Sequence, residues 1–159
     1  MKGNTCLLSS LLLVVGLIVT TTSVADQSRD QPTSLLTVTT TKSMQQTLAD
    51  LKDAIANNNY VFIRQQNIDS RLTDVARENG QVILVYFCNF NMLDRALKKD
   101  SRVGVFLPCR ITLIQKSGYI EMVAINPKVI GKQLNEKNLN GLCDQLSHDY
   151  SQILEEAAL

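Results

Sequence analysis

Two apolar runs, each carrying a cysteine and joined by a short amphipathic segment, occupy residues 82–114 and most constrain how this chain folds. The first run ends in Cys88-Asn89, and the second carries Leu107-Pro108-Cys109-Arg110. Between them, residues 91–99 place apolar side chains on one helical face and charged side chains on the other. The stretch therefore predicts two strands joined by one helix, with a cysteine in or at the end of each strand.

The two apolar runs predict different kinds of strand. Residues 82–87 are apolar on both faces, which is typical of a central strand buried on both sides, or on one side and at a partner surface. Residues 103–115 are predicted to form the next strand. Because proline lacks the N–H that a sheet requires, Pro108 predicts a bulge, a bend or an edge within it.

Periodicity and turn residues predict the other elements. Ser43-Met44-Gln45-Gln46 has the form of a capping box, and Gly118 marks the turn of a hairpin. Asn126-Pro127 ends the hairpin, and residues 128–137 are predicted to be an irregular connection. The remaining strands are predicted at 35–41, 60–64 and 119–125, and the remaining helices at 44–56, 69–79 and 139–156.

This order of elements predicts a single α+β domain over residues 35–159. The order is strand, helix, strand, helix, strand, helix, a two-stranded hairpin and a final helix. The hairpin makes at least part of the sheet antiparallel, and the helices must bury their apolar stripes against one face of it. We therefore expect two layers, with a mainly antiparallel sheet covered by helices on one face.

The N-terminal segment predicts export. Lys2 gives a positive start, and residues 7–19 are almost wholly apolar but too short to span a bilayer core of roughly 30 Å. Ser23-Val24-Ala25 offers the small residues that a signal peptidase reads. We expect residues 1–25 to be a signal peptide and residues 26–34 a flexible leader; the alternative is an uncleaved N-terminal anchor.

The composition of the expected mature chain excludes some classes of protein. Cleavage leaves 159 − 25 = 134 residues. It also removes Lys2, one of 16 basic residues, so the expected mature chain has 15 basic and 15 acidic residues. Nucleic-acid-binding proteins usually carry a basic excess and aromatic side chains for stacking, whereas aromatic residues are 5% of this chain. We therefore expect an exported protein, periplasmic or secreted, with no nucleic-acid partner and no membrane contact after cleavage.

Several short motifs together resemble a known family. They occur in the order Cys88-Asn89, Gly104, Leu107-Pro108-Cys109, Gly118 and Asn126-Pro127. This arrangement is similar to the domain of unknown function family 302, over about residues 35–154. The resemblance implies the family's α+β fold and implies no established activity. Three features depart from the family pattern, namely Phe90 where a proline is common, the export signal, and Cys143 in the last helix.

Cys88 and Cys109 are the main candidates for a functional site, and three interpretations are open. The predicted helix N-terminus after Cys88, with Arg95 and Arg110 nearby, favours a reactive thiolate for redox, metal or ligand chemistry. An oxidising compartment favours a structural disulfide, which would close a loop of roughly 22 residues and stabilise the fold by about 3 kcal/mol. Alternatively, both are buried thiols that pack as small apolar side chains.

The other candidates have weaker support from the sequence. Asn89 is predicted to cap the helix or, alternatively, to bind a ligand. Arg64 and Arg110 lie among apolar strand residues, where a guanidinium can hold a carboxylate ligand; the alternative is a solvated sheet face or an ion pair with Asp94 or Asp100. Cys143 lies on the apolar stripe of the last helix and is predicted to pack in the core; alternatively, with Cys88 and Cys109 it would form a soft-metal site suited to Cu(I).

These candidates favour a binding protein over an enzyme. The sequence shows no HExxH, no CxxC and no glycine-rich phosphate loop, and its one histidine, His148, falls off the apolar stripe. We expect an exported module that binds a small ligand or a protein partner at Cys88 and Cys109, with no cofactor. The alternatives are a periplasmic thiol-redox protein that uses the same pair and a copper binder. An apolar sheet with partial helix cover also predicts a homodimer.

Overall fold

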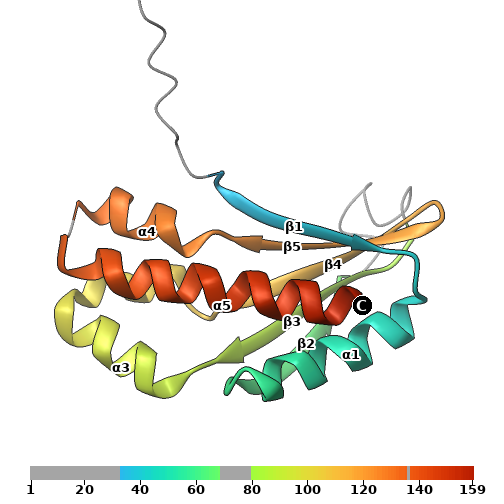
Figure 1. Ribbon diagram of the computed structural model, residues 1–159, viewed down its shortest axis with the longest axis horizontal. Helices are drawn as coiled ribbons and strands as arrows, with labels where there is room; N and C mark the ends of the chain where they lie inside the picture. The colour runs from blue at the N-terminus through green and yellow to red at the C-terminus, as the bar shows by residue number, and fades with distance from the viewer. Residues whose placement is uncertain (1–32, 69–79, 136) are drawn as a thin grey trace, which may run out of the picture. The chain divides into compact units, whose positions relative to one another are not determined.

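The computed structural model of the chain describes residues 33–68, 80–135 and 137–159. The predicted signal peptide at 1–25 and helix at 69–79 lie outside the described residues, so both remain predictions. In the described part, the strands form one antiparallel sheet in the order β1-β5-β4-β3-β2 (Figure 1). Their bounds are β1 Leu35–Thr40, β2 Val61–Asn67, β3 Val82–Cys88, β4 Arg110–Lys116 and β5 Tyr119–Ile125.

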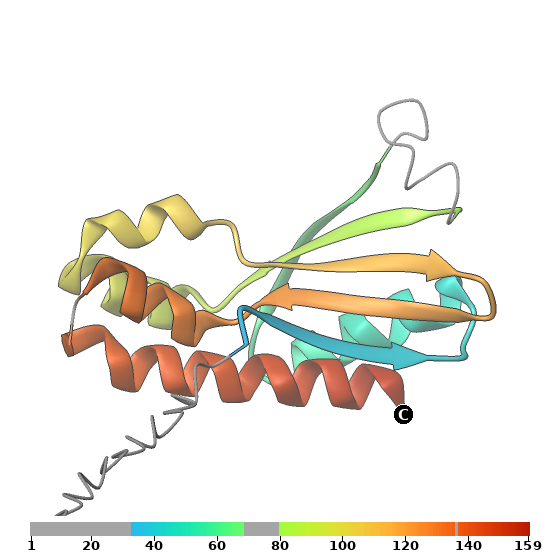
Figure 2. The ribbon, with the colours of Figure 1, turned by 90° about the horizontal axis from the view of Figure 1, so that it is seen from above.

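Two helices cover one face of this sheet. Helices α1 and α5 lie on the same side of the strands (Figure 2), and their apolar side chains join those of β3, β4 and β5 in one core. The predicted two-layer α+β fold is confirmed. The helix bounds are α1 Met44–Asn57, α3 Phe90–Lys99, α4 Pro127–Leu134 and α5 Asn140–Ala158, with 3-10 helices η1 Ser101–Phe106 and η2 Lys137–Leu139. No helix in the described ranges is long and apolar enough to cross a membrane.

Helix α1 begins and ends where its capping residues predict. The backbone N–H of Gln46 donates to Ser43 Oγ over 3.2 Å, which satisfies one of the free amides of the first turn. The reciprocal half of the predicted capping box is wrong, because the Gln46 side chain donates to Asp50 instead. After the helix, Asn59 adopts a left-handed φ of 62°, a conformation that asparagine tolerates better than most residues.

Strand β3 is an interior strand that is buried on both faces, as its continuous apolar run predicts. It lies between β2 and β4, and Val85 and Phe87 pack into the helix-covered core. On the opposite face, Tyr86 is 7% exposed, and the Arg64 guanidinium lies 4.3 Å above its ring. None of the described helices packs on this second face, and the predicted homodimer remains a prediction.

The strand predicted at 103–115 is wrong in its first half. Residues Ser101–Phe106 form η1, and β4 begins only at Arg110. The Asp100 carboxylate accepts the backbone N–H of Arg102 over 2.9 Å and thereby caps the 3-10 helix. The Leu107-Pro108 bond that follows is cis, and because Pro108 has no N–H to donate, regular pairing with β3 starts after it.

The connection predicted to be irregular at 128–137 contains helix α4. The sequence pattern Asn126-Pro127 begins this helix rather than only ending β5, because proline fits the first helical position, where no N–H is needed. The N–H of Lys128 donates to Asn126 Oδ1 over 3.0 Å. Asn135, in the left-handed conformation at φ 52°, ends the helix.

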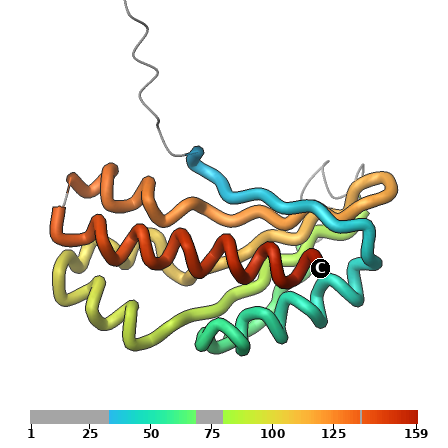
Figure 3. The backbone as a smooth tube through the Cα atoms, viewed as in Figure 1, coloured from blue at the N-terminus to red at the C-terminus, as the bar shows by residue number. Residues whose placement is uncertain are grey.

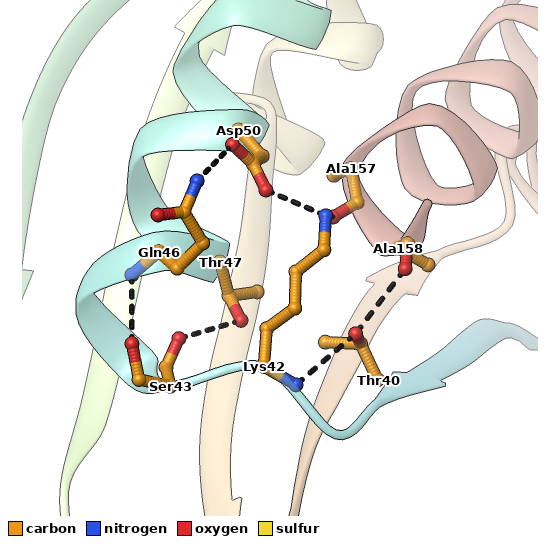
Figure 4. Close-up of polar contacts among 8 residues, drawn as sticks. All are labelled: Thr40, Lys42, Ser43, Gln46, Thr47, Asp50, Ala157 and Ala158. Atoms are coloured by element: carbon orange, nitrogen blue, oxygen red, sulfur yellow. Dashed lines mark hydrogen bonds and ion pairs between the residues drawn. The ribbon is translucent and has the colours of Figure 1, made fainter.

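Polar contacts hold the C-terminal end of α5 against the turn between β1 and α1 (Figures 3 and 4). Lys42 Nζ pairs with the Asp50 carboxylate and also donates to the carbonyl of Ala157 over 3.3 Å. The Thr40 hydroxyl donates to the carbonyl of Ala158 over 3.2 Å. These donors satisfy carbonyls of the last helical turn, which have no partner within the helix.

We expect Asp50→Asn to destabilise the fold at neutral pH and to lose this effect in acid. Hydrogen bonds from Lys42 and Gln46 hold the pKa of Asp50 below its ordinary value of 3.8. The paired carboxylate therefore stabilises the fold fully above pH 3.8, and the stabilisation is lost as the pH falls through the lower pKa of the folded state. Urea unfolding at pH 7 and at pH 3 measures the difference between variant and wild type. The exposed Asp53→Asn on the same helix is the control and should change stability by under about 0.5 kcal/mol. A difference for Asp50→Asn that grows in acid contradicts the prediction.

Candidate functional site

A cavity of about 170 Å³ opens at the end of the sheet where β3 ends and β4 begins. Helices α3 and α4 and the first half of α5 lie beyond this end of the strands (Figures 1 and 2). Side chains from α3, η1, α4 and α5 line the cavity together with the strand ends, and most of them are apolar. The site is thus formed by elements that are distant in sequence.

Cys88 and Cys109 both line this cavity, as free thiols. The backbone N–H of Phe87 donates to the carbonyl of Cys109 over 3.1 Å, which fixes the ends of the two strands beside each other. The structure therefore brings the two sequence candidates together at one site. It shows no disulfide between them, and the proposed structural bond is not part of this state of the chain.

The structure raises the pKa of the Cys88 thiol instead of lowering it, which counts against the reactive-thiolate interpretation. Burial is the larger cause and the nearby Cys109 the smaller, and together they raise the pKa of Cys88 to about 11. Burial also raises the pKa of Cys109, although its hydrogen bond with Tyr150 offsets part of that rise. Desolvation therefore affects the pKa values of both thiols more strongly than the nearby N-terminus of α3 does. At neutral pH the cavity therefore holds two neutral thiols.

Two tyrosines and a methionine also line the cavity beside the cysteines. None of the three was predicted from the sequence to be a site residue. The Tyr60 hydroxyl donates to Asp149 Oδ2 over 2.8 Å and lies 3.7 Å from Met92 Sδ. The Tyr150 hydroxyl is buried beside Cys109. Burial, as the leading cause, raises the pKa of both phenols. In the sequence, Tyr150 is one residue of the apolar stripe of α5, and nothing in that pattern indicates that its side chain reaches the cavity.

The other sequence candidates divide into those at the cavity and those elsewhere. Asn89 and Arg110 line it, and Asn89 also caps α3 by accepting the N–H of Met92 over 3.1 Å. Arg95 is exposed and does not line the cavity, and Arg64 lies on the open face of the sheet over Tyr86.

Cys143 lies in a separate cluster. It is buried with Leu139 and Leu142 and contacts Gly131 of α4, and it does not line the cavity. Cys143 therefore packs in the core, and the alternative three-thiolate metal site is not formed. Across the described ranges, no group of three or more His, Cys, Asp and Glu side chains is placed to hold a metal ion. His148, which falls off the apolar stripe of α5, is exposed.

Fold and site together define a two-layer α+β domain with an apolar, thiol-lined cavity at one end of its sheet. The comparisons with known proteins agree with this fold. A family model described as "Domain of unknown function DUF302" matches residues 36–157, so the chain belongs to the DUF302 family.

A solved structure shows the same fold. The crystal structure of the uncharacterized conserved protein DUF302 from Bacillus stearothermophilus is similar to this chain with a TM-score of 0.68 and 19% sequence identity. The likeness covers 79% of this chain and 98% of that protein. Among curated proteins, no match is found. The family and fold are thereby shown.

Proposed function

We propose that this protein binds a small, largely apolar molecule in the cavity at Cys88 and Cys109. The observation that carries the proposal is the cavity itself, which the structure builds from apolar side chains of four helices and three strand ends. An unfilled cavity costs free energy, because the side chains that line it lack van der Waals contacts on the side that faces the empty space. A concave apolar site with a few polar groups is the usual form of a ligand site.

The size and polarity of the cavity limit the class of ligand. An apolar protein cavity of about 150 Å³ takes up one benzene molecule, so about 170 Å³ suits a single ring or a short branched chain. The polar residues on its lining include Tyr60, Asn89 and Arg110. Because the single Tyr60 proton is donated to Asp149, its oxygen is left to accept a hydrogen bond from a ligand O–H or N–H.

The mouth of the cavity is also apolar. Val105 lines the cavity and is 82% exposed, and Ile125 lines it and is 43% exposed. Exposed apolar side chains at the rim of a cavity provide a surface on which an apolar ligand or a side chain of a partner loses its water. The rim therefore supports entry from solvent at this point.

We expect indole and benzene, used as probes, to bind the wild-type protein and to shift the amide NMR signals of residues around the cavity. Leu93→Phe adds volume at a half-buried lining position, so it should abolish or strongly weaken binding of both probes. Leu97→Phe makes the same chemical change on the same helix, at an exposed position outside the lining, and should bind as the wild type does. No binding to the wild type, or equal binding by the two variants, would reject the proposal.

A thiol–disulfide carrier is the second candidate, because two free thiols line one cavity. In such a reaction the thiolate of one cysteine attacks a disulfide of a partner, and one partner thiol leaves with a proton. The second cysteine then attacks the mixed disulfide and releases the other partner thiol. The pair is oxidised to a disulfide and the partner is reduced to two thiols. The raised pKa values disfavour this candidate, since the thiolate is the nucleophile.

The rate of alkylation separates the two candidates. For a ligand site we expect iodoacetamide to modify Cys88 slowly at pH 7, with a rate that rises about tenfold per pH unit until the pH approaches 11, because only the thiolate reacts. Peptide mass spectrometry follows each cysteine separately. Fast alkylation of Cys88 at pH 7, together with a mixed disulfide after exposure to oxidised glutathione, would favour the carrier.

A further inference from the structure

We propose that the free edge of β1 pairs with the same edge of a second copy of this chain, so that the protein is a dimer with twofold symmetry. The two five-stranded sheets then form one continuous antiparallel sheet. This inference goes beyond the binding of a small molecule and does not depend on it. It assigns the homodimer that the sequence predicts to an edge of the sheet, rather than to the face that the described helices leave uncovered.

The two edges of the sheet differ in how open they are to pairing. β1 and β2 are its outermost strands (Figure 2). Native edge strands usually avoid pairing through charged side chains, prolines or bulges. β2 has two such features, the charged Arg64 and a shift of register between Phe62 and Arg64. β1 has the sequence LLTVTT, without charge or proline, and it pairs with β5 without interruption from Leu35 to Thr40. β1 is therefore the edge that a further strand can join.

The backbone of β1 directs alternate residues outward. The N–H of Asn126 donates to the carbonyl of Ser34 over 3.0 Å, and the neighbouring residues Leu35 and Ile125 lie opposite each other. Hydrogen-bonded and non-hydrogen-bonded pairs alternate along an antiparallel ladder, so every even-numbered residue of β1 bonds to β5. The N–H and C=O groups of the odd-numbered residues point to the outer edge, with which none of the described strands pairs. These residues are Leu35, Thr37 and Thr39.

Antiparallel pairing about a twofold axis at Thr37 uses all of these outward groups. Thr37 then lies opposite the partner's Thr37, and Leu35 lies opposite the partner's Thr39. Because every residue in these pairs points outward, each pair exchanges both of its hydrogen bonds. Moving the axis by one residue along the strand leaves an outward residue at one end with no residue of the partner's β1 opposite it. An interface on a twofold axis must be complementary to its own copy, and the edge of β1 meets this requirement.

The side chains of β1 also fit this register. Leu36 and Val38 pack against the helix-covered core but are only half-buried. Between two copies, Leu36 lies opposite the partner's Val38 in a non-hydrogen-bonded pair, the arrangement in which facing side chains are closest. The apolar core on the helix side thus continues from one copy into the other. On the opposite face, Leu35 is 51% exposed and is partly covered by the partner's uncharged Thr39.

A pair of charge variants tests both the edge and its register. Leu35→Lys/Thr39→Lys places like charges opposite each other across the interface, whereas Leu35→Glu/Thr39→Lys places opposite charges there. Both variants carry Thr39→Lys, beside Glu121 on β5, so within one chain they differ only at the exposed residue 35. We expect the wild type and Leu35→Glu/Thr39→Lys to sediment as dimers at micromolar concentration. The dissociation constant of Leu35→Lys/Thr39→Lys should be at least about tenfold higher than that of Leu35→Glu/Thr39→Lys.

Disulfide trapping locates the twofold axis. In a hydrogen-bonded antiparallel pair the Cα atoms lie about 5.5 Å apart, within the range that a disulfide spans. Thr37→Cys should therefore cross-link two copies on mild oxidation. Thr39→Cys is the matched control, because the partner's Thr39 lies four residues further along the strand, roughly 13 Å away. It should cross-link no more than the wild type does through its native cysteines. Non-reducing gel electrophoresis measures the covalent dimer.

Three results would overturn the proposal. One is a wild-type protein, expressed from the full sequence, that is monomeric at micromolar concentration. Another is an equal dissociation constant for the two charge variants, whether the dimer persists in both or is lost in both. The third is equal cross-linking of Thr37→Cys and Thr39→Cys. The substituted residues are exposed, and circular dichroism verifies that each variant is folded.

Discussion

Replacing Phe87 by alanine should lower the free energy of unfolding by about 3–5 kcal/mol, the range for loss of a buried aromatic side chain. Phe87 is fully buried at the end of β3. Its ring centroid lies 5.6 Å from that of Tyr60, in an edge-to-face arrangement, and 5.1 Å from that of Tyr150. The substitution therefore removes buried area and two aromatic contacts at once, and the surrounding strands cannot collapse into the space.

Urea unfolding followed by circular dichroism measures this loss. Phe90→Ala is the matched control, because it makes the same change three residues further along the chain, at a position that is 57% exposed. A change within about 0.5 kcal/mol is expected there. Equal losses for the two variants would show that Phe87 does not anchor the core. Because Tyr60 and Tyr150 also line the cavity, Phe87→Ala should further weaken binding of the indole probe.

Asn126→Ala should cost about 2–4 kcal/mol, a large effect for a polar residue, because its side chain is 4% exposed and makes three hydrogen bonds. Its Oδ1 accepts the Ser147 hydroxyl and the N–H of Lys128, each over 3.0 Å. Its Nδ2 donates to the carbonyl of Thr33 over 2.9 Å. Alanine removes the cap of α4, worth about 1 kcal/mol, and leaves the buried Ser147 hydroxyl without this acceptor.

Two variants separate the parts of this effect. Asn89→Ala removes another asparagine cap, from the half-buried start of α3, and should cost only about 1 kcal/mol. Asn126→Asp keeps both acceptor bonds and loses the donor to Thr33, so the N-terminal segment before β1 should exchange its amide hydrogens faster. Losses of the same size for Asn126→Ala and Asn89→Ala would show that only the cap matters.

Local signals predicted most of the elements well. The capping-box pattern at Ser43-Met44-Gln45-Gln46 and the helical periodicity after it predicted α1 to within one residue of its end at Asn57. The unbroken apolar run of β3 predicted a strand buried on both faces. These features depend on neighbours within a few residues, and short-range spacing is what a sequence displays directly.

The errors arose where one local signal had two structural meanings. Pro108 indicated an interruption, and sequence alone did not show that η1 rather than strand precedes it. Asn126-Pro127 was taken as the end of a strand, although the same pair is suited to begin a helix. In both cases the competing structures differ mainly in tertiary contacts that are remote in the chain.

The sequence alone determined the family, the two-layer α+β class and the choice of Cys88 and Cys109 as the candidate site, because motifs and periodicities are properties of short stretches. Only the tertiary structure decided the character of the site. It placed Met92, Tyr60 and Tyr150 beside the two thiols, moved Cys143 to another cluster, and raised the pKa of the cysteines. The pKa of a thiol depends on its burial and on neighbouring side chains that are distant in sequence, and both are defined only once the chain is folded.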